Sequence, residues 1–463
     1  MKEKVLKTLR DSKSARWTAL AIVSFTMLTG YYINYVISPL KPLLEEYMGW
    51  NSADFGLWNS AYGWFNVFFL MLIFGGIILD KFGVRFTGLG AAITMIIGTG
   101  FQYAAIENLF NYAPDALILG VKAQIAIGAF GFAVFGMGVE IAGITVSKII
   151  VKWFKGKELA LAMGLEMATA RLGTALALAV PVSIATAFGV NGIPSLSAPV
   201  AAGLGLLVAG FIAFIWYTFM DRKLDNELKE DLNGDEEEFK VSDIKKVVFN
   251  KGFWLIALLC VLFYSGVFPF LYFASDLMVN KFGLDPKYAG AIPSLLPFGT
   301  ILLTPLFGNI YDRKGKGATI MLIGSIMLLL VHSFFSVPFL NNWIVALVLI
   351  LFLGITFSLV PSAMWPSVPK IIDERQLGTA YALIFWVQNW GLMGVPLIIG
   401  YVLEEYCIIS REVIAGVTKT QYDYTIPMMI FASLGGLAII VAFMLKAEDR
   451  KKGYGLELPN IEK

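Results

Sequence analysis

The chain has 463 residues, of which 57% are hydrophobic and only 15% are charged, with a formal net charge of +2. Because soluble domains carry roughly 25% charged residues, this composition excludes a single soluble core and makes lipid the expected solvent. Two cysteines, Cys260 and Cys407, and a single histidine, His332, offer no spacing for a disulfide framework or a metal site. We expect His332, which lies in an apolar stretch, to be a packed helix residue.

The N-terminal segment is basic and leads into an apolar run at 17–40. This run is too long for the core of a signal peptide and lacks a small-residue cleavage site, so it is expected to be the first span. A span needs about 20 mainly apolar residues, because the hydrocarbon core is about 30 Å thick. By this rule the sequence predicts twelve spans, at 17–40, 54–79, 86–106, 123–150, 159–188, 199–220, 252–275, 288–310, 318–337, 342–369, 378–403 and 424–445.

Positive charge sets the expected orientation. With a cytoplasmic N-terminus, the segments expected inside hold 27 Lys and Arg residues, whereas those expected outside hold 6. Cytoplasmic loops carry such an excess, so both termini are expected in the cytoplasm. The charged stretch 221–250 lies at the midpoint and is expected to be a cytoplasmic linker between a six-span half at 1–220 and another at 251–463.

A short motif recurs at equivalent positions in the two halves. Each copy has a glycine four residues before an aspartate, then a base, a glycine and another base, and the two aspartates are 232 residues apart. The glycines favour a tight turn, and the aspartates are expected to accept hydrogen bonds from a helix N-terminus or to pair with the bases that follow. The motif residues are Gly76, Asp80, Lys81, Gly83 and Arg85 after the second span, and Gly308, Asp312, Arg313, Gly315 and Lys316 after the eighth.

This repeat resembles the major facilitator superfamily, whose loop between spans two and three has a Gly…Asp-(Arg/Lys)-x-Gly-x-(Arg/Lys) pattern, with a weaker copy between spans eight and nine. The resemblance covers essentially the whole chain. It implies an all-α membrane protein with a twelve-span fold, two six-helix halves related by pseudo-two-fold symmetry, and a rocking, alternating-access mechanism.

Charged side chains inside spans are costly and therefore indicate function. The clear cases are Glu140 in the fourth span, and Glu166 and Arg171 in the fifth. Glu140 and Arg171 are expected at similar depths, roughly 16–20 Å from the cytoplasmic end at about 1.5 Å per residue. Such a pair could bind the ammonium and the carboxylate of a zwitterion, or it could be a structural salt bridge between two spans. Glu166 could neutralise Arg171 or accept a proton.

Polar and aromatic side chains in other spans add weaker signals for a cavity. Gln388 and Asn389 are adjacent polar residues in the eleventh span, and Trp365 belongs to a proline-rich stretch of the tenth. Prolines free backbone groups, which is tolerated mainly where a helix faces protein or a water-filled cavity. The residues expected to line the cavity, besides Glu140 and Arg171, are Tyr31, Tyr62, Trp64, Asn66, Trp365, Gln388 and Asn389.

Several short stretches resemble a narrower family within the superfamily, the dipeptide uniporters of animal lysosomes and their bacterial relatives. In that family a glutamate in the fourth span and an arginine in the fifth are thought to hold the two ends of the peptide, which implies these roles for Glu140 and Arg171. Glu166 departs from the family pattern, in which an uncharged polar residue is expected. The matching stretches are Tyr62-Gly63-Trp64-Phe65-Asn66, Trp153-Phe154-Lys155-Gly156-Lys157-Glu158-Leu159, Ala170-Arg171-Leu172-Gly173, Val267-Phe268-Pro269-Phe270, Ala363-Met364-Trp365-Pro366, Gln376-Leu377-Gly378-Thr379-Ala380-Tyr381 and Gln388-Asn389-Trp390-Gly391.

The sequence therefore predicts a secondary transporter of small solutes, and first of all a dipeptide or small-peptide uniporter with Glu140 and Arg171 as end clamps. The alternative is a proton-coupled carrier of organic anions or sugar phosphates, with Arg171 as the anion site and Glu166 as the proton acceptor. A non-transporting membrane receptor would be expected to have a larger soluble domain. No P-loop, histidine-rich cluster or serine elbow occurs, so we expect neither an enzyme nor ATP-driven transport, and no cofactor.

The expected partners are a zwitterionic peptide and the lipid bilayer, with no nucleic acid, and the chain is expected to act as a monomer. The N-terminal tail has no acidic dileucine sorting signal, and the external loops have no Asn-x-Ser/Thr sequon. These observations favour the cell (inner) membrane over a lysosomal membrane.

Overall fold

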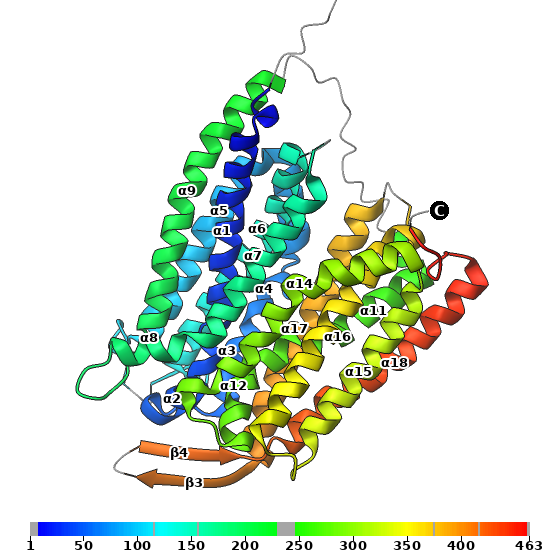
Figure 1. Cartoon of the computed structure of the whole chain (residues 1–463). Coiled ribbons are helices and arrows are strands. Elements are labelled where there is room, and N and C mark those ends of the chain that lie inside the picture. The colour runs from blue at the N-terminus through cyan, green and yellow to red at the C-terminus, as the bar shows by residue number, and fades with distance from the viewer. Residues whose placement is uncertain are drawn as a thin grey trace, which may run out of the picture.

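The computed structural model describes residues 8–113, 116–154, 157–228, 246–373, 376–414 and 417–460. Positions 155 and 156 of one matching stretch, and 229–245 of the expected linker, lie outside the described residues. Most of the described residues are helical, and the helices form two bundles that lie side by side (Figure 1).

Each bundle is built from one half of the chain. The N-terminal bundle contains η1 (Leu9–Asp11), α1 (Lys13–Tyr35), η2 (Ser38–Leu40), α2 (Lys41–Met48), α3 (Ser52–Ser60), η3 (Ala61–Gly63), α4 (Trp64–Phe68), α5 (Met71–Ile106), β1 (Leu117–Ile118), β2 (Val121–Lys122), α6 (Ala123–Phe154), α7 (Leu159–Ala179), α8 (Pro181–Ala187) and α9 (Ala198–Leu228). The C-terminal bundle contains α11 (Lys251–Ser265), α12 (Phe268–Phe282), α13 (Pro286–Ala289), α14 (Ala291–Lys314), α15 (Gly317–Ser336), α16 (Trp343–Ile371), α17 (Leu377–Tyr406), β3 (Ile408–Ile414), β4 (Val417–Tyr422) and α18 (Thr425–Lys452). β1 and β2 pair in antiparallel fashion, as do β3 and β4.

Among the described residues, 11 helical segments are long and apolar enough to cross a membrane. This number is one fewer than the expected twelve, because the second expected span is not a continuous helix. It consists of α3, η3 and α4, followed after the left-handed residue Leu70 (φ 53°) by the first part of α5. α5 then turns at Gly83, whose φ of 77° suits glycine, and continues as the third span.

The last turns of α9 extend into the expected linker. The sixth span is expected at 199–220, but α9 continues to Leu228 and carries Asp221 on a buried face. Asp221 accepts hydrogen bonds from Lys152 Nζ (2.8 Å), Trp153 Nε1 (3.2 Å) and Tyr217 OH (2.9 Å). A carboxylate can be buried at a helix end when this many donors surround it, so the start of the expected linker is part of the N-terminal bundle.

The two ends of the molecule differ in how the bundles meet. We call the end that carries β3 and β4 the hairpin face, and the end that carries η1 and the last turn of α18 the terminal face (Figure 1). Near the hairpin face, α3 and α17 touch through their backbones. A Cβ atom at Gly56 would lie 2.6 Å from the Pro396 carbonyl oxygen and 2.8 Å from Gly400 Cα. The bundles are therefore closed against each other at this face.

Replacing Gly56 by alanine is expected to destabilise the protein by about 1–3 kcal/mol, because the added methyl group would meet backbone atoms that cannot rotate away. The matched control is Gly90→Ala in α5, an exposed position where a Cβ atom meets no other atom within 4 Å. Thermal unfolding of the purified variants, followed by tryptophan fluorescence, should show a lower Tm for the Gly56 variant only. Equal Tm values would contradict the backbone contact.

At the terminal face, the ion pairs among the described residues join partners from the same half. Lys157 pairs with Asp11 at 2.9 Å, and Lys251 pairs with Glu448 at 2.8 Å. Hydrogen bonds from the Lys157 ammonium and the Thr8 hydroxyl lower the pKa of Asp11 to about 2, so this pair stays charged near neutral pH. None of these ion pairs would have to break if the halves separated at this face.

Candidate functional site

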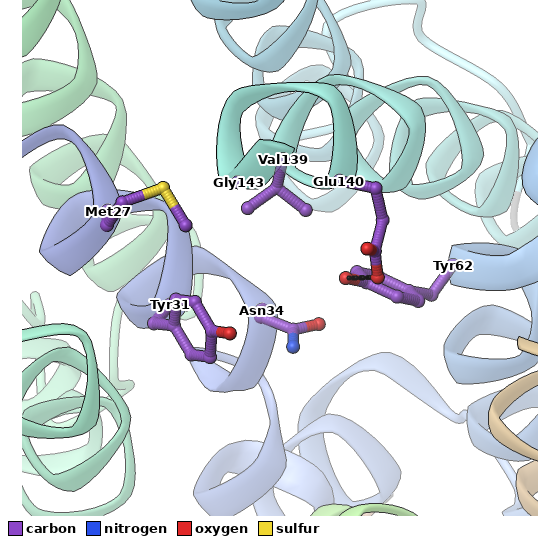
Figure 2. Close-up of a pocket in the computed structure, with 7 residues that line it drawn as sticks. All are labelled: Met27, Tyr31, Asn34, Tyr62, Val139, Glu140 and Gly143. Atoms are coloured by element: carbon purple, nitrogen blue, oxygen red, sulfur yellow. Dashed lines mark hydrogen bonds between the residues drawn. The ribbon is translucent and has the colours of Figure 1, made fainter. Parts of the chain in front are cut away.

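A cavity of about 60 Å³ lies where α1, η3 and α6 meet (Figure 2). Tyr31 and Asn34 are three residues apart on α1, and Glu140 and Gly143 are three residues apart on α6, so each pair lies on one helix face. The side chains that line the cavity are Met27, Tyr31, Asn34, Tyr62, Val139, Glu140 and Gly143. Three of the predicted site residues, Tyr31, Tyr62 and Glu140, are therefore brought together.

Glu140 is the charged group among these seven residues. Tyr62 OH donates a hydrogen bond of 2.8 Å to Glu140 Oε1, as Figure 2 shows. Within the described part of the chain, no Lys or Arg forms an ion pair with Glu140. Neutral donors orient a carboxylate without cancelling its charge, so Glu140 can still bind a cationic group.

Arg171 lies beside the cavity and shares one of its walls. Its Cζ atom is 5.9 Å from the ring centroid of Tyr31, 5.5 Å from that of Phe268 and 4.8 Å from that of Phe357. No carboxylate in the described ranges forms an ion pair with its guanidinium. The structural salt bridge between Glu140 and Arg171, one of the two interpretations of the sequence, is therefore not formed in this structure.

Glu166 is half-buried on α7 and forms no hydrogen bond or ion pair with another residue that the structure describes. It is five residues from Arg171, which places the two side chains about 140° apart around a helix of 3.6 residues per turn. A direct ion pair with Arg171 is thus absent, and a role for Glu166 as a proton acceptor stays a prediction.

Asn66 and Asn389 meet at the boundary of the two halves. Asn66 Nδ2 lies 3.4 Å from Asn389 Oδ1 and 3.4 Å from the Gly136 carbonyl oxygen, and both asparagine side chains are fully buried. Because Asn66 belongs to α4 and Asn389 to α17, this contact joins the two halves beside α6, the helix that carries Glu140.

Three other predicted residues, Trp64, Trp365 and Gln388, do not line the cavity. Trp365 Nε1 donates to Tyr264 OH at 2.9 Å, and the Gln388 side chain accepts a bond of 3.5 Å from Cys260 Sγ. In the second half, these polar groups are satisfied by neighbours in their own bundle. Periodicity alone cannot predict such pairings.

His332 is a packed residue, as expected. Its Nε2 lies 2.8 Å from the Gly266 carbonyl oxygen, and its ring stacks on Phe431 at 5.3 Å. Both cysteines are buried with free thiols, and no group of three or more potential metal ligands occurs in the ranges that the structure describes.

The first copy of the loop motif surrounds the turn at Gly83. Asp80 pairs with Lys148 of α6 at 3.0 Å, and Arg85 pairs with Asp225 of α9 at 3.1 Å. Asp80 thus pairs with a base on a neighbouring helix. The partners expected from the sequence were a helix N-terminus or the bases that follow the aspartate in the chain. The motif links three helices of one half at the terminal face.

The second copy is held by the segment that follows α18. Asn460 Nδ2 donates to Asp312 Oδ1 at 2.8 Å, and Glu457 Oε1 accepts from the Thr319 backbone N–H at 2.9 Å. Gly315 has a φ of 68°, and a Cβ atom there would lie 2.5 Å from the Glu457 carbonyl oxygen. This copy therefore needs its glycine for both conformation and space.

A buried ion-pair cluster at the hairpin face was not predicted from the sequence. Lys41 of α2 is fully buried, and its Nζ lies 2.7 Å from Asp276 Oδ2 of α12 and 2.8 Å from Glu45 Oε1. Tyr422 OH donates to Glu45 at 3.2 Å, and Tyr424 OH donates to Asp276. Lys41 and Glu45 belong to the N-terminal half, and the other three to the C-terminal half. We call these five residues the Lys41 cluster.

The molecule has two bundles of membrane-length helices that are closed against each other at one face. Charges without an ion-pair partner among the described residues lie beside a cavity near the boundary of the bundles. This is the architecture of a polytopic membrane transporter. The chain matches the family described as the Major Facilitator Superfamily over residues 20–396, and it belongs to that family. It is therefore an integral, multi-pass membrane transporter and not an enzyme, as the sequence predicted.

Comparison with individual proteins supports this assignment. The lysosomal dipeptide transporter MFSD1 of Danio rerio is 29% identical over 398 residues, which cover 84% of this chain and 81% of that protein. The protein named probable sulfoacetate transporter SauU, of Cupriavidus necator, is 25% identical over 90% of this chain and 91% of its own length. The crystal structure of a mutant of the nucleoside transporter NupG aligns with a TM-score of 0.68 at 15% identity, covering 93% of this chain and 99% of that one. The last likeness shows the fold alone.

Proposed function

We propose that this chain carries dipeptides or similarly short peptides across a membrane by alternating access, as a uniporter. The observation that carries the proposal is the pair of unpaired opposite charges that meet at Tyr31. Glu140 lines the same cavity as Tyr31, and the Arg171 guanidinium packs against the Tyr31 ring. A peptide with free ends offers an ammonium group for Glu140 and a carboxylate for the fork-shaped donors of Arg171.

The cavity is too small to hold a peptide by itself. A volume of about 60 Å³ corresponds to about two water molecules at about 30 Å³ each. We therefore infer that a bound peptide extends from the cavity along Tyr31 to Arg171, at the boundary with Phe268 and Phe357 of the other half. A binding site shared by two rocking halves is what alternating access requires.

The contacts at the two faces support this mechanism. The Lys41 cluster and the contact between Gly56 and Gly400 join the halves at the hairpin face, whereas the terminal-face ion pairs stay within each half. We infer that the structure is the state closed at the hairpin face. The excess of Lys and Arg at the terminal face favours a cytoplasmic location for it, in the cell (inner) membrane. Transport would then require the Lys41 cluster to open.

A proton-coupled carrier of organic anions is the second candidate. It is favoured by the absence of an anionic partner for Arg171 among the described residues, and by the relative named as a sulfoacetate transporter. This candidate gives Glu140 no ligand, although the carboxylate is oriented toward the cavity by Tyr62. The peptide proposal uses both charges.

Uptake into proteoliposomes tests the proposal. The purified protein should take up a labelled dipeptide, unlabelled dipeptides should compete, and free amino acids, sulfoacetate and sugar phosphates should compete weakly. Collapse of the proton gradient should leave the uptake unchanged, because a uniporter needs no second gradient. Absence of dipeptide uptake together with gradient-dependent uptake of sulfoacetate would replace the proposal by the second candidate.

A further inference from the structure

Arg171 is held in an unusual way for a charged residue within a span. Such residues normally pair with an opposite charge or with backbone carbonyls, because a buried unpaired charge is costly. In the described part of the chain, Arg171 has neither an ion pair nor a hydrogen bond. Three aromatic rings lie against its guanidinium, and the Phe357 ring is the nearest of them, with its centroid 4.8 Å from Cζ.

Two of these rings come from the opposite half of the molecule. Arg171 belongs to α7, whereas Phe268 begins α12 and Phe357 lies in α16. The face of an aromatic ring attracts a guanidinium group electrostatically. It does not occupy the N–H donors, which point outward in the guanidinium plane. The rings can therefore fix the position of Arg171 and leave its donors available.

The rings are themselves fixed by a cluster of aromatic side chains in the C-terminal half. Phe268 and Phe357 pack edge to face with centroids 5.2 Å apart, and Tyr264 contacts Phe268 at 5.3 Å and Phe357 at 5.7 Å. Trp365 Nε1 donates a hydrogen bond of 2.9 Å to Tyr264 OH. Phe357 is only 3% exposed, so its orientation is set by packing. Trp365 thus supports the arginine through Tyr264 without lining the cavity.

We propose that Phe357 is a positioning residue for Arg171, which it holds across the boundary of the two halves so that the guanidinium can bind the carboxylate end of the substrate. This inference rests on the proposed function and adds a residue that the sequence pattern does not indicate. The group recognised is a carboxylate, because two parallel N–H donors match its two oxygens.

Transport kinetics of two substrates test the role of Phe357. The substrates are a dipeptide and the same dipeptide with an amidated C-terminus, which cannot engage Arg171 as an anion. Phe357→Leu should raise the KM for the dipeptide about 10-fold, equivalent to ~1.4 kcal/mol, with little change in kcat. The KM for the amide should stay unchanged. Phe357→Trp, which retains an aromatic face, should restore the dipeptide KM to within about 3-fold of the wild-type value.

The matched control is Phe335→Leu, because Phe335 is a fully buried phenylalanine of α15 in the same half that contacts Phe270 and Phe282. A loss of packing alone would affect both substrates to the same degree in either variant. Equal effects of Phe357→Leu on the dipeptide and the amide, or an unchanged dipeptide KM, would overturn the inference.

Failure of the proposed function gives a different result, because wild-type protein would then not transport the dipeptide at all. In that case the thermal shift produced by sulfoacetate reports on the same arginine. Phe357→Leu should weaken the binding of sulfoacetate about 10-fold, whereas Phe335→Leu should leave this affinity unchanged. An anion affinity that is unaffected by Phe357→Leu, or no stabilisation of the wild-type protein by sulfoacetate, would overturn the inference here too.

Discussion

Replacing Glu140 by glutamine is expected to reduce dipeptide transport by about 100-fold or more, because the substitution removes a charge that a desolvated ammonium group requires. Glutamine has nearly the same shape, and its carbonyl oxygen can still accept the hydrogen bond from Tyr62. The variant should therefore insert and fold like the wild type. Initial rates of uptake into proteoliposomes measure the effect, with protein content matched by quantitative immunoblotting.

The choice of substrate makes this prediction specific. An N-acetylated dipeptide lacks the ammonium group, so its already slow transport should be insensitive to Glu140→Gln. The matched control is Glu166→Gln, since Glu166 is another half-buried glutamate within a span and forms no hydrogen bond or ion pair with a described residue. It should transport dipeptides like the wild type. Loss of transport only in the Glu166 variant would favour the proton-coupled anion carrier.

Replacing Lys41 by methionine is expected to shift the protein strongly toward a state that is open at the hairpin face. In the closed state the substitution leaves Glu45 and Asp276 buried without their cation, which costs about 3–5 kcal/mol. In a state open at this face, water would hydrate both carboxylates, so the penalty falls mainly on the closed state. Because each 1.36 kcal/mol is a factor of ten, the ratio of closed to open protein should fall by roughly two to four orders of magnitude.

The native Cys407 can report this shift. It lies at the end of α17 beside the hairpin, is 3% exposed, and burial raises the pKa of its thiol to about 11. A membrane-impermeant maleimide should therefore label it slowly in the wild type, and about 10-fold or more faster in Lys41→Met. A Cys260→Ser background removes the other thiol.

Two further variants decide whether the Lys41 cluster is responsible. Lys122→Met breaks a pair of similar length, 2.7 Å to Asp54, but this pair lies within the N-terminal half and is partly exposed. It should leave the labelling rate of Cys407 unchanged. The double variant Lys41→Met with Asp276→Asn removes opposite charges from both halves and should return the rate toward the wild-type value. Unchanged labelling in Lys41→Met would show that the cluster does not hold this face closed.

Much of the fold could be predicted because lipid imposes a simple rule on the chain. Runs of about 20 apolar residues must be spanning helices, and the repeated motif at Asp80 and Asp312 indicated two related halves. The break in the second span at Leu70 could not be predicted in this way. An apolar run has the same composition whether its helix is continuous or interrupted, and the interruption is visible only in φ values.

The candidate site was predicted unevenly for a similar reason. Glu140 and Arg171 are conspicuous because charges are rare within spans. Phe357 gave no signal, since it is one apolar residue within a long apolar helix, and its contact with Arg171 joins α16 to α7. Trp365 and Gln388 had the right chemistry for a cavity, but they are satisfied by Tyr264 and Cys260 in their own bundle.

The Lys41 cluster was missed because charges close to span ends are usually exposed loop residues. Asp276 lies one residue beyond the predicted end of the seventh span at 275, and Lys41 one residue beyond the end of the first at 40. Their separation, 276 − 41 = 235 residues, is close to the 232 residues that separate Asp80 and Asp312. Opposite charges at equivalent positions of a repeat were therefore the available signal for a contact between the halves.

An experimental structure with a bound dipeptide is the most direct measurement of whether Glu140 and Arg171 hold the two ends of the substrate. We predict that the peptide amino group lies within hydrogen-bond distance of the Glu140 carboxylate, and that the peptide carboxylate forms two parallel hydrogen bonds with Arg171. Tyr31 should line the peptide between them. A dipeptide bound in the reverse orientation, or at a site that contacts neither side chain, would contradict this account.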